Sequence, residues 1–348
     1  MIRHMKRHQP GCPILVRLHR AGWGIERSET VFLSPATGLQ RTNEEPTVPA
    51  LRPIQPILRE GEAILQPPMD NTPNDAPSSP PVRIPHFGHA LLFLAIAGTL
   101  LLLLQTLLVG IFHPSVIGHK ISAASIPPHL LIGSEALTYL ASLTIAWGIF
   151  PLLWQRSFSN GLQLNFAATR RNALKLIPIG ITLSLIVNAI SSLITQPKDL
   201  PIEAFFRDRI DIWLITAFGV LLAPFFEETV FRGFLLPAFA IAYDWLTLHR
   251  TEAALAEWNS TNRITRAGWA FSAILTSIFF TLLHAPQVSY AWPVLLLLFC
   301  VSLILSFVRL RLRSVLASTL VHASYNFAIF LIAFIGTDGY RHLDKLTH

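Results

Sequence analysis

The chain has 348 residues, of which 52% are hydrophobic and only 14% charged, and its formal net charge is +7. Soluble domains carry about 25% charged residues, so this composition and a mean hydropathy of +0.49 indicate a polytopic membrane protein. Two cysteines, Cys12 and Cys300, exclude a disulfide framework and a paired-thiol metal site. The basic residues cluster at the ends of apolar segments, where membrane topology accounts for them, so no nucleic-acid partner is expected.

Residues 1–85 differ from the rest of the chain. They hold 14 of its 25 prolines and show no sustained apolar period, which predicts a disordered, proline-rich N-terminal tail. The tail has no apolar region followed by a small-residue cleavage site, so a secretory signal peptide is not predicted. Met69 stands shortly before the first apolar run, and the sequence leaves open whether the protein starts there or at Met1.

Seven apolar segments follow the tail, and runs of about 20 residues are long enough to cross a membrane as helices. The segments are Ala90–Phe112, Leu130–Trp154, Leu174–Thr195, Trp213–Tyr243, Trp269–His284, Pro293–Val308 and Val315–Ile335. The fourth is longer than needed and contains Pro224 and Pro237, so it is expected to be kinked or divided, and an eighth span stays open. The predicted fold class is all-α, a polytopic transmembrane bundle of about seven to eight helices.

Loop charges predict the orientation of the bundle, because cytoplasmic loops carry an excess of Lys and Arg. The loops after the second, fourth and sixth segments are basic and fall on one side of the membrane. They contain Arg156, Arg170, Arg171 and Lys175, then Arg250, Arg263 and Arg266, then Arg309, Arg311 and Arg313. A cytoplasmic N-terminus and, with seven spans, an external C-terminus follow.

Three ionisable residues, Glu227, Glu228 and Arg232, lie inside the otherwise apolar fourth segment. Each costs roughly 2.5 to 3.5 kcal/mol near a bilayer centre, so a role beyond stability is indicated. Glu228 and Arg232 are four residues apart and share a helix face, which predicts an ion pair. Glu227 points about 100° away and has no such partner, which makes it the candidate general base.

The fifth and seventh segments carry further polar groups. His284 ends the fifth, one turn after Phe280, whose ring is expected to pack beside the site. His322 and Asn326 are four residues apart in the seventh and should face the protein interior. Two imidazoles, a carboxylate and an amide can activate a water and stabilise an oxyanion, and they are also plausible metal ligands.

The three motifs together resemble the CPBP, or Abi, family of CAAX prenyl proteases and bacteriocin-processing enzymes. The family signature is Glu-Glu-x-x-x-Arg, Phe-x-x-x-His and His-x-x-x-Asn on successive transmembrane helices. This chain has all three in that order, as Glu227-Glu228-Thr-Val-Phe-Arg232, Phe280-Thr-Leu-Leu-His284 and His322-Ala-Ser-Tyr-Asn326. The resemblance covers about Trp213 to Ile335, roughly a third of the chain.

The resemblance implies an intramembrane endopeptidase that cleaves membrane-associated peptide or protein substrates in the lipid bilayer. Carried to matching positions, Glu227 is the base, His284 and His322 are site histidines, Asn326 stabilises the oxyanion, and Glu228 with Arg232 give support. Family members have been described as metalloproteases and as metal-independent glutamate proteases. No cofactor is certain. A divalent metal such as zinc would have to be held by Glu227, His284 and His322, since the His-Glu-x-x-His motif of zincins is absent.

The resemblance also suggests an organisation and a location. Residues 1–85 would be the tail, 86–200 the N-terminal transmembrane helices and 201–340 a CPBP-like peptidase core. The expected location is the bacterial plasma membrane, as a multi-pass protein. The sequence does not predict which substrate is cleaved, whether it is prenylated, or the oligomeric state.

Two other functions use the same residues. A transporter or proton relay also needs buried Glu, His and Arg side chains, and a non-catalytic membrane scaffold would keep them as structural pairs. Glu135, in the second segment, is predicted to be a near-surface carboxylate. One conflict concerns depth, because His284 falls near the outer end of its segment while Glu227 lies near the middle of its own. The fifth helix must therefore begin later, tilt or extend for the two to meet.

Overall fold

The structure, a computed structural model, describes residues 83–112, 126–194 and 201–346. The tail predicted for residues 1–85 lies outside these ranges except for its last three residues, and so do both candidate start positions. The described ranges contain helices and no strand, which confirms the predicted all-α class.

Seven helices are long and apolar enough to cross a membrane, as the predicted segments required. They are α1 (Phe87–Phe112), α2 (Pro128–Trp154), α4 (Phe166–Ser191), a continuous run over Arg209–Thr247, α9 (Arg266–His284), α10 (Trp292–Leu312) and α11 (Val315–Gly336). The shorter elements are α3 (Phe158–Gly161), α8 (Glu252–Ser260) and three 3₁₀ turns, Pro201–Phe206, Ala285–Val288 and Leu343–Leu346.

The fourth span is a single helical run of 39 residues rather than two elements. Two π-helical segments interrupt it, so that α5 (Arg209–Ala217), α6 (Ala223–Glu228) and α7 (Leu236–Thr247) are joined by Phe218–Leu222 and Thr229–Leu235. Each π segment ends two residues before a proline, Pro224 or Pro237. A proline has no N–H and its ring clashes with the carbonyl four residues earlier, and the wider π turn accommodates both effects.

The third span begins eight residues before its predicted start, at Phe166 instead of Leu174. The Asn165 side chain accepts a hydrogen bond from the Ala168 amide at 2.9 Å and caps the helix there. The early turns contain Arg170 and Arg171, which hydropathy places outside a membrane segment. Both are good helix formers, so the helix extends beyond the apolar stretch.

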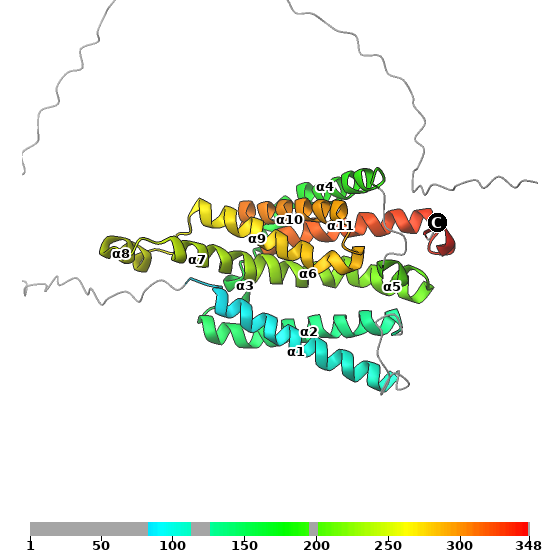
Figure 1. The fold of residues 1–348 in the computed structure, drawn as a ribbon, viewed down its shortest axis with the longest axis horizontal. Helices are drawn as coiled ribbons and strands as arrows, with labels where there is room; N and C mark the ends of the chain where they lie inside the picture. The colour runs from blue at the N-terminus through cyan, green and yellow to red at the C-terminus, as the bar shows by residue number, and fades with distance from the viewer. Residues whose placement is uncertain (1–82, 113–125, 195–200, 347–348) are drawn as a thin grey trace, which may run out of the picture. The chain divides into compact units, whose positions relative to one another are not determined.

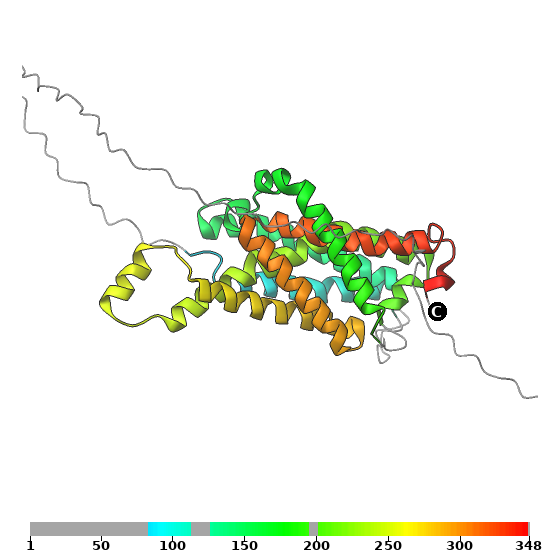
Figure 2. The same cartoon turned by 90° about the horizontal axis from the view of Figure 1, so that it is seen from above.

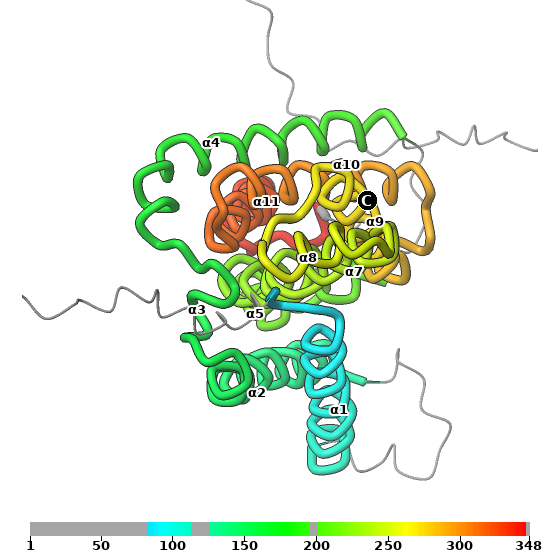
Figure 3. Tube along the Cα trace, turned by 90° about the vertical axis from the view of Figure 1, so that its left-hand side faces the viewer, coloured from blue at the N-terminus to red at the C-terminus, as the bar shows by residue number. Residues whose placement is uncertain are grey.

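The helices form layers on either side of the long α5–α7 run (Figures 1, 2 and 3). In Figure 3, α1 and α2 lie on one side of this run, α9, α10 and α11 on the other, and α4 covers α10 and α11 from outside. The backbone contacts agree, because α1 and α2 touch the long run while α4 packs against α11 and α10. The long run is therefore the central element of the bundle.

Two apolar clusters stabilise the bundle, and the first of them includes the long run. On the α1–α2 side, the rings of Phe93 and Phe150 pack against Phe234 with centroid separations of 4.6 and 4.9 Å. All three rings are fully buried. On the other side of the bundle, α4, α10 and α11 share a second cluster that includes Leu305 and Val321. The first cluster fixes the long run against α1 and α2, and the second fixes α4 against α10 and α11.

Gly180 marks a close backbone approach, where α4 crosses α11. A Cβ atom added there would overlap the Val321 carbonyl oxygen and lie 2.7 Å from Ser324 Cβ. Small residues allow such close crossings in membranes. Replacing Gly180 by Ala should destabilise the protein by about 1 to 3 kcal/mol because the two backbones must separate.

Thermal unfolding of the purified protein in detergent measures this effect. Gly148→Ala is the matched control, since a Cβ atom at Gly148 in α2 meets nothing within 4 Å. That change should leave stability unchanged or raise it by up to about 1 kcal/mol. Equal behaviour of the two variants would mean that α4 and α11 do not cross at Gly180.

Candidate active site

The candidate site is built on a fully buried ion pair. Glu228 and Arg232 are both 0% exposed, and Arg232 Nη1 donates to Glu228 Oε1 at 2.8 Å. This is the pair that the four-residue spacing predicts. Arg232 Nη2 also donates to the carbonyl and the hydroxyl oxygens of Ser302 on α10, at 2.8 and 2.7 Å. Buried charges require such multiple partners, and these bonds tie the long run to α10.

His322 on α11 is oriented by the same carboxylate. Its Nδ1 lies 3.1 Å from Glu228 Oε1. A carboxylate oxygen accepts, so the hydrogen sits on Nδ1, and in the neutral ring Nε2 carries a free lone pair. That Nε2 is 3.9 Å from Oε2 of Glu227. Glu228 thus serves as the orienting partner of His322, while Glu227 faces the opposite side of the ring.

His284 reaches the site from the last residue of α9. Its Nδ1 donates to the Phe280 carbonyl oxygen at 2.8 Å, which again leaves Nε2 as an acceptor in the neutral ring. Nε2 lies 3.8 Å from Glu227 Oε2. The sequence placed His284 at the end of one span and Glu227 near the middle of another. The two meet because the long run has 39 residues, of which Glu227 is the nineteenth, and the end of α9 lies beside this midpoint.

Three acceptor atoms therefore converge, namely Oε2 of Glu227 and the Nε2 atoms of His284 and His322. The Glu227 oxygen is buried and accepts no hydrogen bond from any described residue. Buried acceptors are rarely left without a donor. The separations of 3.8 and 3.9 Å are too long for direct hydrogen bonds. A water molecule between these atoms can donate one hydrogen to Glu227 Oε2 and the other to one imidazole Nε2.

Phe280 forms one wall of the site, as its position one turn before His284 predicts. Its ring centroid is 4.5 Å from that of His284 and 5.9 Å from that of His322. The Arg232 guanidinium lies 4.9 Å from the same ring. The buried ring keeps bulk water from the ion pair, and it strengthens the pair by lowering the local dielectric constant.

Asn326 lies one turn beyond His322 but bonds to the long run instead of the three acceptors. Its Nδ2 donates to the Gly219 carbonyl oxygen at 2.7 Å. That carbonyl has no helical partner, because the Ala223 amide bonds to Phe218 and Pro224 has no N–H. The amide of Asn326 therefore completes the π segment, and its second N–H remains for the oxyanion role that the resemblance implies.

Replacing Asn326 by Ala should destabilise the protein by about 1 to 3 kcal/mol, since the partly buried Gly219 carbonyl would lose its donor. Asn188→Ala is the matched control, because Asn188 Nδ2 donates to the Ser184 carbonyl within its own helix. Thermal unfolding should show a clear loss for the first variant and little change for the second. Equal melting temperatures for Asn326→Ala and wild type would contradict the bond.

The same three side chains are the candidate ligands for a metal ion. Their donor atoms suit a divalent cation, since both Nε2 atoms and a carboxylate oxygen face one point and each Nδ1 is held by a second partner. Ligand atoms around tetrahedral zinc are roughly 3.4 Å apart, closer than the observed separations. The described residues contain no group of three or more His, Cys, Asp or Glu side chains that meets metal-site geometry. The three donor atoms are of the kind that binds zinc, but they lie too far apart for a tetrahedral zinc site.

Three residues near the site were not assigned to it from the sequence. Ser302, fully buried in an apolar helix, bonds to Arg232, and a lone serine in a span gives only a weak signal. Glu135 on α2, predicted to be a near-surface carboxylate, interacts electrostatically with Glu227. Tyr139, one turn further along α2, stacks on Phe226 at 3.7 Å and brings α2 beside the site.

A carboxylate facing two imidazoles inside a bundle of seven spanning helices places the chain among multi-pass membrane proteins with a glutamate–histidine centre. Comparison with known protein families gives a more specific match. Residues 209–328 match the family described as "Type II CAAX prenyl endopeptidase Rce1-like", which confirms the resemblance to the CPBP family. The matched region starts with the long run and includes every motif residue. No curated protein and no solved structure matched the chain in the same comparisons.

Proposed function

We propose that the protein is an intramembrane endopeptidase that hydrolyses peptide bonds of membrane-associated substrates, in the plasma membrane of a bacterium. One observation carries the proposal. Glu227 Oε2 is buried and without a donor among the described residues, yet two histidine nitrogens lie 3.8 and 3.9 Å from it. This is the arrangement that a water-activating base requires. The Rce1-like match of residues 209–328 supports the same reaction class.

In the proposed reaction, Glu227 takes a proton from the water as the water oxygen attacks the substrate carbonyl carbon. The tetrahedral intermediate then collapses, the C–N bond breaks, and the proton on Glu227 passes to the leaving amine. The second hydrogen of the water is donated to Nε2 of one of the two histidines, and this bond holds the water in place. The free N–H of Asn326 donates to the oxyanion, and the Glu228–Arg232 pair keeps His322 in position. No step above depends on a metal ion, in agreement with the spacing of the three side chains.

The purified full-length protein in liposomes tests this function against a transporter or proton relay. A library of membrane-inserting peptides, with and without a prenyl group, is incubated with the proteoliposomes and the products are read by mass spectrometry. Cleavage without proton or cation flux across the vesicles is the expected result. Flux without cleavage would contradict the proposal. Loss of cleavage in a chelator, followed by recovery with zinc, would assign the three side chains as metal ligands.

A further inference from the structure

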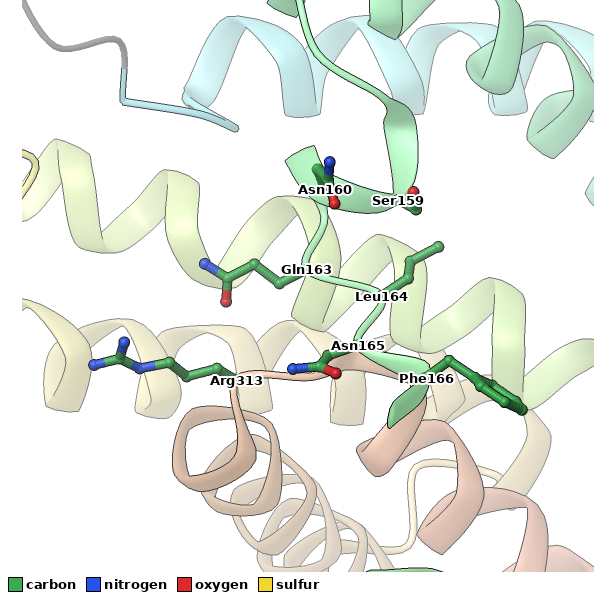
Figure 4. Close-up of a pocket in the computed structure, with 7 residues that line it drawn as sticks. All are labelled: Ser159, Asn160, Gln163, Leu164, Asn165, Phe166 and Arg313. Carbon is green, nitrogen blue, oxygen red and sulfur yellow. The ribbon is translucent and has the colours of Figure 1, made fainter. Parts of the chain in front are cut away.

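A second polar site lies away from the three acceptors, at the end of the bundle where α4 begins. It is a cavity of about 420 Å³ lined by Ser159, Asn160, Gln163, Asn165, Phe166 and Arg313 (Figure 4). Its loop is fixed to the turn between α10 and α11. The Val315 amide donates to the Gln163 carbonyl at 3.2 Å, and the Ser314 hydroxyl donates to the Asn165 carbonyl at 3.1 Å. The cavity is therefore built by two loops that hold each other.

The amide groups in this cavity have a defined orientation. Gln163 Oε1 accepts from Arg309 Nη1 at 3.0 Å, and Asn165 Oδ1 accepts from the Ala168 amide at 2.9 Å. Because both oxygens are occupied by donors, the NH₂ group of each side chain is left for other partners. In Figure 4 the Asn165 nitrogen points to the side of Arg313. The cavity lining thus includes two amide groups with free N–H donors, and Arg313 lines the same cavity.

The charged side chains in the two loops around the cavity are all basic. Residues 155–175 and 305–320, which form both loops and their flanking turns, contain seven Arg and Lys residues and no Asp or Glu. They are Arg156, Arg170, Arg171, Lys175, Arg309, Arg311 and Arg313. The start of the 26-residue helix α4 adds a partial positive charge from its free amides. Donors in a positive field select an anion, and planar guanidinium groups favour phosphate.

The surroundings of the cavity are apolar on the lipid side. Phe166 is 69% exposed and Leu174, two turns along α4, is 90% exposed, although both belong to a spanning helix. A phosphate at this position would have acyl chains available on its neighbouring surface. We propose that the cavity binds the phosphate headgroup of an anionic phospholipid, with Arg313 as the charged contact and Gln163 and Asn165 as amide donors. This site does not depend on the proposed peptidase activity.

Binding of short-chain phosphatidylglycerol to the full-length protein in neutral detergent, measured by native mass spectrometry, tests the site. Arg313→Gln is expected to weaken binding about fivefold, the factor for one basic residue at an anionic headgroup. Arg311→Gln is the matched control, since Arg311 is exposed on the same helix end and does not line the cavity. Asn160→Leu, which leaves the charge unchanged, should also weaken binding.

Three outcomes would overturn the site. The first is equal weakening by Arg311→Gln and Arg313→Gln, which would indicate a diffuse basic surface. The second is phosphatidylcholine binding as tightly as phosphatidylglycerol. The third concerns the source of the phosphate, since glycerol 3-phosphate and inorganic phosphate should not displace the lipid at equal concentration. Displacement by either would overturn the lipid assignment and identify soluble phosphate as the ligand.

Discussion

Replacing Arg232 by Met is expected to cost about 3 to 5 kcal/mol of folding free energy, enough to unfold most membrane-protein preparations at moderate temperature. Arg232 is completely buried and donates to Glu228 and twice to Ser302. Its removal would leave the Glu228 carboxylate charged in the membrane without its guanidinium partner, and the carboxylate that orients His322 would lose that anchor. Thermal unfolding in detergent, followed by size-exclusion chromatography, measures the loss.

A double variant distinguishes the effect of losing the Arg232 charge from the effect of losing its side-chain volume. Glu228→Gln combined with Arg232→Met removes both charges at once and should recover part of the stability lost by the single change. Arg170→Met, at an exposed position of α4, is the matched control and should leave stability within about 0.5 kcal/mol of wild type. No recovery in the double variant would show that Arg232 acts by volume and not by neutralising Glu228.

Replacing Glu227 by Gln is expected to lower the rate of peptide cleavage by about 10² to 10⁴, the usual contribution of a general base. The change keeps the size of the side chain and removes the oxygen that would take the proton. Because Glu227 Oε2 makes no hydrogen bond with the described residues, the variant should fold like wild type. Its melting temperature and substrate affinity should therefore be retained while turnover is lost.

The matched control for this variant is Glu257→Gln, which removes an exposed carboxylate from α8, outside the three motifs. It should cleave at the wild-type rate. Glu135→Gln provides a second comparison, since Glu135 interacts with Glu227 without facing the histidines in any hydrogen bond or ion pair of the described chain. A larger loss of cleavage rate in Glu135→Gln than in Glu227→Gln would indicate that Glu135 on α2 is the general base.

Much of the fold and part of the site were predictable from the sequence. Span positions follow from apolar runs, whose length is fixed by the bilayer, so all seven were found. The Glu228–Arg232 pair follows from helix spacing alone, because residues four apart share a face. The meeting of Glu227 with His284 and His322 required the order of three motifs, since no local rule brings three helices together.

The remaining features depend on tertiary contacts that a local pattern does not contain. The two π segments follow from prolines, but their register is set by neighbours such as Asn326, which completes the free Gly219 carbonyl. The bonds from Arg232 to Ser302 join residues 70 positions apart. The start of α4 was missed because hydropathy measures lipid burial, whereas a helix cap at Asn165 acts through a hydrogen bond.

The central claim is that Glu227 activates a water molecule that cleaves a peptide bond. The most direct measurement is cleavage of a peptide substrate in ¹⁸O-labelled water by wild type and by Glu227→Gln, both in liposomes, with products read by mass spectrometry. The wild type should place one ¹⁸O atom in the new carboxyl terminus, and Glu227→Gln should yield about 10² to 10⁴ times less labelled product in the same time. Labelled product formed by Glu227→Gln at the wild-type rate would contradict the claim.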